Sequence, residues 1–255
     1  MLKDLQIIFH EEMRVNAQAP GFRREESDHV VRHVSLTTDN SFIIASSLTE
    51  ENVDTVIQAE LKYFRSLNQS FEWKVYSYDQ PNDLTDTLKE HGFTIGDPEA
   101  LMVMPINEYQ CPDTSITVQE ITDKKGINDI IELENTVWNE PHQELGERLW
   151  RDKQVHPDSL FLYGIYDNEK LVSAAWMYIE MNSSFASLWG GSTLKEYRKQ
   201  GHYSALLATR VQKARECGRS YLMVDASPMS RPILEKNGFH CLAYSYPCDS
   251  PSILK

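Results

Sequence analysis

The chain has few cysteines and none of the cysteine patterns that build a stapled or metal-bound fold. Its 255 residues include four cysteines, at positions 111, 217, 241 and 248, and none of them form a Cys-x-x-Cys pair. Such pairs are typical of zinc and redox sites, and small secreted domains carry far more cysteine. We therefore expect free thiols, no bound metal and a cytoplasmic location.

Long hydrophobic runs are missing as well. No segment approaches the ~18 consecutive apolar residues of a membrane-spanning helix. The first residues, MLKDLQIIFHEEMRVNAQ, lack the apolar core of a signal peptide. The sequence therefore predicts neither export nor contact with a membrane.

Positive charge is scarce, since 25 Lys and Arg residues stand against 38 Asp and Glu residues and give a formal net charge of −13. A surface that binds nucleic acid needs a basic patch, so the composition argues against a nucleic-acid partner. The same acidity is compatible with a cationic substrate such as an amine, and equally with plain solubility.

The chain contains two successive series of strand and helix patterns. A polar, proline-containing connector, NEYQCPDTS at 107–115, lies between them and places the domain boundary at 110/111. Both series end in Leu-x-x-x-Gly-Phe, at 88–93 and 234–239, which suggests an internal repeat. Local patterns predict Thr49 as the N-cap of a helix and a hairpin turn at Asp167-Asn168.

The stretch LWGGSTLKEYRKQGHYSALLATRVQKARECG, 188–218, joins an apolar strand to an amphipathic helix through the basic turn Arg198-Lys199-Gln200-Gly201. The first amides of a helix lack internal partners and carry partial positive charge, so they bind anions. Gly201 permits a positive φ and a close approach of the ligand. Neither Gly-x-x-x-x-Gly-Lys-[Ser/Thr] nor Gly-x-Gly-x-x-Gly occurs. We expect a phosphorylated ligand here; the alternative is an ordinary connection with solvated basic residues.

The turn resembles the acetyl-CoA pyrophosphate loop of the GCN5-related N-acetyltransferases (GNAT), with the pattern [Gln/Arg]-x-x-Gly-x-[Gly/Ala]. Arg198 and Gly201 match it, Tyr203 departs from it, and Gly238-Phe239 matches the family's closing pair. The resemblance covers about 115–247. It implies an α/β fold (an α+β mixed sheet) with two GNAT-like domains, 1–110 and 111–255, each a mostly antiparallel mixed sheet flanked by helices. The first domain would be a degenerate copy, because its turn SSLTEENVD is acidic.

The resemblance also assigns roles to residues. Gly190-Gly191 would form a bulge in a strand whose backbone binds the pantetheine arm of acetyl-CoA. The implied cofactor-binding residues are Gly191, Ser192, Thr193, Arg198, Lys199, Gln200, Gly201, His202, Tyr203, Ser204 and Ser227. The family's usual acid, a tyrosine before Gly-Phe, is replaced by Leu234. The substitute catalytic candidates are Tyr246, Tyr244, Asp225 and Glu180.

These features predict an acetyl-CoA-dependent N-acetyltransferase that acts by direct transfer in a ternary complex. The acceptor would be a small-molecule or peptide amine. The family's fold usually ends with a seventh strand, and only SPSILK follows Pro247, so a strand from the first domain or from a second chain, as in a homodimer, would fill that edge. The alternative is an acyl-CoA-binding sensor or scaffold without turnover. A third reading is a plain interaction protein.

Overall fold

The structure is a computed structural model that describes residues 2–37, 39–112 and 114–252. By contacts the chain forms two compact units whose segments alternate along the sequence. Unit 1 comprises Met1–Val103, Met181–Ser183 and Asp225–Lys255, and unit 2 comprises Met104–Glu180 and Ser184–Val224. The domain boundary at 110/111 stays a prediction.

Unit 1 is a mixed sheet with helices. Its elements are α1 (Leu2–His10), the π-helical turn η1 (Glu11–Val15), β1 (Phe22–Glu26), β2 (Val30–Ser35), β3 (Ser41–Ser46), α2 (Val53–Ser66), β4 (Phe71–Tyr76), α3 (Leu84–Glu90), β5 (Thr94–Ile95), β6 (Glu99–Pro105, which ends in unit 2), α7 (Arg231–Lys236) and β12 (His240–Asp249). The strand order is β1-β2-β3-β4-β12-β6, with β5 also paired to β12. Among the described residues of unit 1, β3 and β4 are the one pair of neighbouring strands that runs parallel. The late strand β12 thus completes a sheet built mostly from the first part of the chain.

The core of unit 1 follows from helical spacing. Val53, Val56, Ile57 and Phe64 share one face of α2 and pack in a cluster around the fully buried Trp73.

The predicted N-cap at Thr49 is wrong. The helix begins at Val53, and the Asn52 side chain accepts a bond from the Thr49 backbone N–H at 2.8 Å, which closes a turn before the helix.

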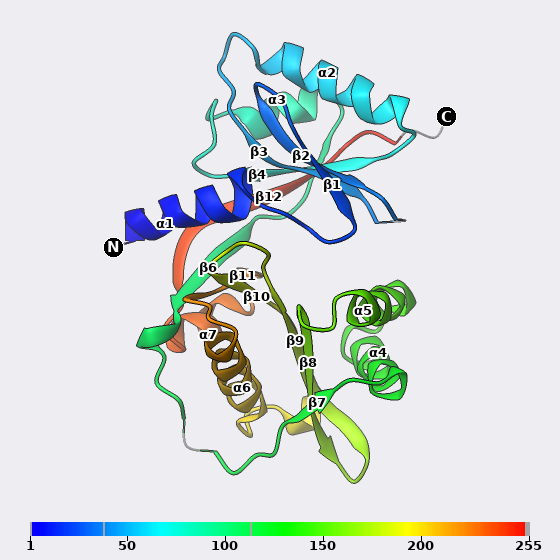
Figure 1. The fold of residues 1–255 in the computed structure, drawn as a ribbon, viewed down its shortest axis with the longest axis vertical. Helices are drawn as coiled ribbons and strands as arrows, with labels where there is room; N and C mark the ends of the chain where they lie inside the picture. The colour runs from blue at the N-terminus through cyan, green and yellow to red at the C-terminus, as the bar shows by residue number, and fades with distance from the viewer. Residues whose placement is uncertain (1, 38, 113, 253–255) are drawn as a thin grey trace. The chain divides into compact units, whose positions relative to one another are not determined.

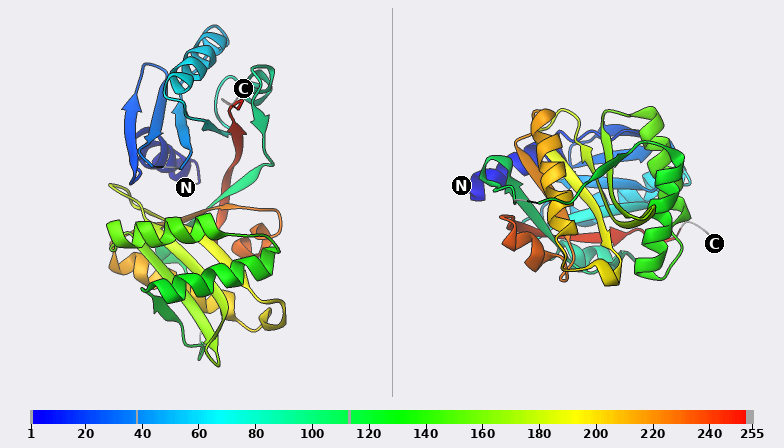
Figure 2. Two further views of the ribbon diagram at one scale, coloured as in Figure 1. Left: turned by 90° about the vertical axis from the view of Figure 1, so that its right-hand side faces the viewer. Right: turned by 90° about the horizontal axis from the view of Figure 1, so that it is seen from below.

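Unit 2 also contains mixed β-structure flanked by helices. Its elements are η2 (Ile106–Glu108), β7 (Gln119–Ile121), α4 (Lys124–Trp138), α5 (Gln143–Val155), β8 (Leu160–Asp167), β9 (Lys170–Ile179), β10 (Phe185–Thr193), η3 (Lys195–Tyr197), α6 (His202–Glu216) and β11 (Tyr221–Ala226, which ends in unit 1). The strand order is β7-β8-β9-β10-β11, and only β10 and β11 run parallel. Helices α4 and α5 cover one face of this sheet and α6 the other (Figures 1 and 2). The expected class, a mostly antiparallel mixed sheet flanked by helices, is confirmed.

The hairpin between β8 and β9 lies one residue later than predicted. Asp167 pairs with Lys170, and the two turn residues are Asn168 and Glu169, with φ of 46° and 68°. A two-residue hairpin turn of this kind needs positive φ at both central positions, and asparagine adopts positive φ more readily than most residues. Asp167 instead forms the last residue of β8.

Candidate functional site

Strand β10 is interrupted by a bulge at its two glycines. The register with β9 shifts between Gly190 and Ser192, and φ is 68° at Gly190 and 103° at Gly191. A side chain at Gly190 would place its Cβ 2.3 Å from the ring of Trp176, so only glycine fits there. The bulge predicted from the sequence is confirmed.

The same strand leaves its parallel neighbour just before the bulge. Strands β10 and β11 pair from Phe185 with Tyr221 to Ser187 with Met223, whereas β10 continues to Thr193. Beyond Ser187, in the described part of the chain, one edge of β10 therefore has no β11 partner. Such an edge can bind an extended ligand through main-chain hydrogen bonds.

The basic turn ends where α6 begins. Gly201 is the N-cap residue, with φ of 90°, and as a glycine it has no side chain to cap the first amides of the helix. Lys199 also has positive φ, 63°. Arg198, Lys199 and Gln200 are exposed, and Gln200 Nε2 donates to the Glu196 carbonyl at 2.9 Å. Helix amides beside exposed cations make a site suited to an anion.

Contacts within the segment hold the turn against the end of β10. Arg198 Nε donates to the Thr193 carbonyl at 3.1 Å, and His202 Nδ1 lies 2.9 Å from the Tyr197 carbonyl. Ser204 is half-buried in the first turn of α6. The structure thus brings together the predicted cofactor-binding residues from Gly191 to Ser204.

Tyr203, the departure from the family pattern, links α6 to the bulge. Its ring carbon lies 3.6 Å from the place where a Cβ at Gly191 would stand. Burial raises the pKa of Tyr203, which keeps its hydroxyl protonated. The ring therefore occupies the space beside Gly191 that a smaller residue would leave open.

Glu180 lies directly after β9, and its carboxylate reaches β10. Ser187 Oγ donates to Glu180 Oε1, and Trp189 Nε1 donates to Ser187 Oγ at 2.9 Å. Burial raises the pKa of Glu180 above the ordinary glutamate range. Because Ser187 is the last residue of β10 paired with β11, the Glu180 carboxylate lies at the point where the two strands separate.

Glu134 was not predicted, yet it contacts the same strand. It is 4% exposed and accepts from Ser192 Oγ and Trp138 Nε1 at Oε2, both at 2.9 Å. Its Oε1 is buried without a partner among the described residues, and burial raises its pKa. The sequence signal is its spacing, because it follows Ile130 by four residues and so lies within the apolar stripe of α4.

The other predicted residues belong to unit 1. Asp225 accepts from Lys74 Nζ at 2.6 Å and from Ser245 Oγ at 3.3 Å, so both its oxygens are engaged. Ser227 Oγ accepts the backbone N–H of Ser230 at 3.3 Å, beside α7.

The two candidate tyrosines have different surroundings within unit 1. Tyr244 is exposed and bonds Arg231 Nη1, while Tyr246 packs against the hydrophobic core of the unit. Leu234, in the position of the family's usual acid, is 2% exposed. The roles assigned to these residues stay predictions.

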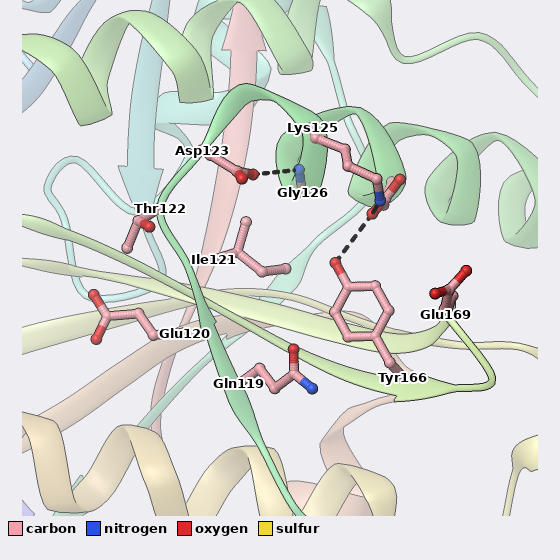
Figure 3. A pocket seen from close by; sticks show the side chains of 10 residues that line it. Gln119, Glu120, Ile121, Thr122, Asp123, Lys125, Gly126, Tyr166 and Glu169 are labelled. Atoms are coloured by element: carbon pink, nitrogen blue, oxygen red, sulfur yellow. Dashed lines mark hydrogen bonds and ion pairs between the residues drawn. The ribbon is translucent and has the colours of Figure 1, made fainter.

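A pocket of about 490 Å³ lies between the start of α4 and the hairpin of β8 and β9 (Figure 3). Its polar groups bond one another: Asp123 Oδ1 caps the Gly126 N–H at 2.8 Å, and Asp129 Oδ2 accepts from Lys125 at 3.0 Å and Tyr166 at 3.1 Å. None of the predicted site residues lines it.

Two other features are absent from the residues that the structure describes. No group of three or more His, Cys, Asp or Glu side chains is placed to hold a metal ion. No helix there is long and apolar enough to cross a membrane.

The comparisons with known proteins concern the family and the fold. Residues 127–239 match the family model of the Acetyltransferase (GNAT) family. No curated protein sequence matches the chain.

Three solved structures resemble the chain over nearly its whole length. A GCN5-related N-acetyltransferase from Kribbella flavida has a TM-score of 0.70 at 13% identity and covers 96% of this chain and 95% of its own. A functionally unknown conserved protein from Staphylococcus epidermidis has a TM-score of 0.66 at 13% identity, and the match covers 96% of this chain and 98% of that protein. A tandem GNAT protein from the clavulanic acid biosynthesis pathway has a TM-score of 0.61 at 11% identity, and the match covers 93% of this chain and 85% of that protein. At these identities the likeness shows the fold, which is that of GNAT proteins.

Proposed function

We propose that unit 2 is an acetyl-CoA-dependent N-acetyltransferase that transfers the acetyl group directly to a primary amine. The observation that carries this proposal is the continuous path from the bulged edge of β10 to the Gly201 turn. The family match at 127–239 supports the same class of activity.

The residues present fit acetyl-CoA. The turn from Arg198 to Ser204 would hold the pyrophosphate, because it combines the free amides of α6 with exposed positive charge. The backbone of Gly191, Ser192 and Thr193 would bind the pantetheine arm like an added strand. When bound, the cosubstrate supplies an activated acyl group.

Glu180 is the base that the geometry favours. An ammonium group cannot attack a carbonyl, so one amine proton must leave before the new N–C bond forms and the C–S bond breaks. Glu180 would take that proton through Ser187 Oγ, and its raised pKa makes it a stronger base than an exposed glutamate. The nitrogen then loses its second proton to water, and the thiolate takes a proton from water and leaves as free CoA. Tyr246 and Tyr244, the acids proposed from the sequence, belong to unit 1, and no step is assigned to them.

Unit 1 would be a degenerate copy of the same architecture. Its parallel pair, β3 and β4, runs from Ser41 with Phe71 to Ile43 with Trp73 and then ends. The register between β2 and β3 shifts at Ile44, as the register between β9 and β10 shifts at Gly191. Each unit thus has a bulged strand that leaves a parallel neighbour.

In unit 1 a buried ion pair between Arg14 and Asp79 bonds to the bulged strand β3. Arg14 Nε donates to the Ile44 carbonyl at 2.8 Å, and its two terminal nitrogens donate to Asp79 at 2.6 and 2.7 Å. Asp79 in turn accepts the Tyr76 backbone N–H at 2.9 Å. The Ile44 carbonyl of β3 and the Tyr76 N–H of β4 are therefore bonded to side chains of unit 1. This supports one cofactor site per chain, in unit 2.

A mass-spectrometric screen of primary amines with acetyl-CoA tests the proposal. We expect at least one acetylated amine, with free CoA released in equal amount. Binding of acetyl-CoA without release would favour the non-catalytic sensor, which the loss of the usual acid at Leu234 also favours. An absence of binding would favour the plain interaction protein.

A further inference from the structure

Three side chains of β10 share the face of the sheet that α4 and α5 cover. In the register with β9, Ser187 lies opposite Tyr178, Trp189 opposite Trp176 and Ser192 opposite Ala174. Directly opposed residues of antiparallel strands point to the same side, and 174, 176 and 178 alternate onto one face. The bulge at Gly190-Gly191 therefore keeps Ser187, Trp189 and Ser192 on one side.

Two indole rings are anchored to this face by their nitrogens. Trp189 donates to Ser187, which donates to Glu180, and Trp138 donates to Glu134 and, at 3.2 Å, to Ser192. Each ring is nonetheless about half exposed, 50% for Trp189 and 52% for Trp138. The indole nitrogen of each residue is thus bonded within the protein, while about half of each tryptophan stays open to a ligand.

The carboxylates behind the indoles decide which ligand suits them. When an indole N–H donates a hydrogen bond to a carboxylate, directly or through a hydroxyl, the indole ring is polarised. The π face of the ring then carries more negative charge. Cations bind that face, and tryptophan binds them best among aromatic residues. Glu134 adds a second sign of an unfilled site, because its Oε1 is buried and lacks a partner in the described residues.

The charge of the neighbouring segment agrees. From Glu134 to Glu147 the chain has four glutamates and no lysine or arginine. Beyond this segment, Arg148 is exposed, and Arg151 pairs with Asp152 at 3.1 Å. Acidic residues therefore predominate in the segment that carries Trp138, as a cationic ligand requires. The charge around Trp189 is mixed, because Arg148 and Arg151 lie near Tyr178, whose ring contacts Trp189.

We propose that Trp138 and Trp189 form a cation-binding surface that selects acceptors with a second ammonium group, that is, diamines and polyamines. This inference rests on the proposed acetyl transfer and names the class of its acceptor. The distal ammonium would bind the indoles while the reacting nitrogen approaches the point where β10 and β11 separate.

Two amines of equal chain length test the inference. Cadaverine carries a distal ammonium and pentylamine does not. We expect kcat/KM for cadaverine to exceed that for pentylamine about tenfold, as two cation–π contacts at exposed sites allow. Trp189→Leu and Trp138→Leu should each lower this preference about two- to fivefold, mainly through KM. The phenylalanine variants, which keep a π face, should retain most of it, and Val155→Ala, at another exposed apolar residue of unit 2, should change nothing.

Calorimetric titration of cadaverine into the CoA-saturated protein gives a readout without turnover. If neither amine is acetylated but Trp189→Leu weakens cadaverine binding, the cation surface stands and the proposed reaction fails. If both amines are used equally well, or if the leucine variants match Val155→Ala in turnover and binding, the inference is overturned while acetyl transfer can still stand.

Discussion

The proposed role of Glu180 as the general base can be tested directly by substitution. Removing a general base costs about 100- to 10,000-fold in rate, so Glu180→Gln should lower kcat within that range while acetyl-CoA still binds. The base works only when deprotonated, and burial raises its pKa. Activity should therefore fall with decreasing pH at a higher pH than an ordinary glutamate would give. A pH–rate profile of the parental protein measures this limb, and Glu180→Gln with parental kcat would contradict the assignment.

The pair Arg14 and Asp79 makes a second residue-scale prediction, on stability. Arg14 is fully buried, so Asp79→Ala would leave a guanidinium without its counter-ion and the Tyr76 N–H without an acceptor. Breaking such a pair costs about 3–5 kcal/mol. Urea unfolding should show this loss. Glu26→Ala breaks the pair with Arg24, in which Glu26 is exposed and Arg24 is half-buried, and should cost less than about 1 kcal/mol. Equal losses in the two variants would show that the buried pair does not hold unit 1 together.

At the scale of elements, the turn before α6 should fail when its glycine changes. Gly201→Glu adds a side chain and a negative charge where the anion would lie, and each lost charge-assisted bond is worth about 1.5–3 kcal/mol. We expect acetyl-CoA binding to be lost in a folded protein. Gly218→Glu is the matched control, since Gly218 also has positive φ, 71°, with open space around it at the far end of α6. If both variants bind acetyl-CoA equally, the turn is not the binding site.

Much of the segment from the bulge in β10 to the start of α6 could be predicted, because its sequence signals are local. Two adjacent glycines mark the bulge, and a glycine between a basic turn and an apolar period marks the start of α6. Strand β1 was missed because FRREE has charged residues where alternation is expected.

Other features depend on contacts between distant residues. The pairing of β12 with β4 and the buried Arg14 and Asp79 pair join positions far apart in the chain, so no local pattern reports them. The position of Glu134 in an apolar stripe was visible, but its bond to Ser192 on β10 was not.

At the scale of the whole molecule, the two units differ in the feature that would bind the cofactor. Unit 2 has an open edge beyond Ser187 and a basic turn. Unit 1 has the Arg14 and Asp79 pair at its bulge and an acidic turn with Glu50, Glu51 and Asp54. The account therefore requires a single binding event per chain.

Calorimetric titration of the full chain with acetyl-CoA tests this requirement most directly. We predict one site per chain, unchanged in Asp79→Asn, which keeps the bulk of the side chain in unit 1, and absent in Gly201→Glu. Two equivalent sites, or no binding by the parental protein at all, would contradict the account.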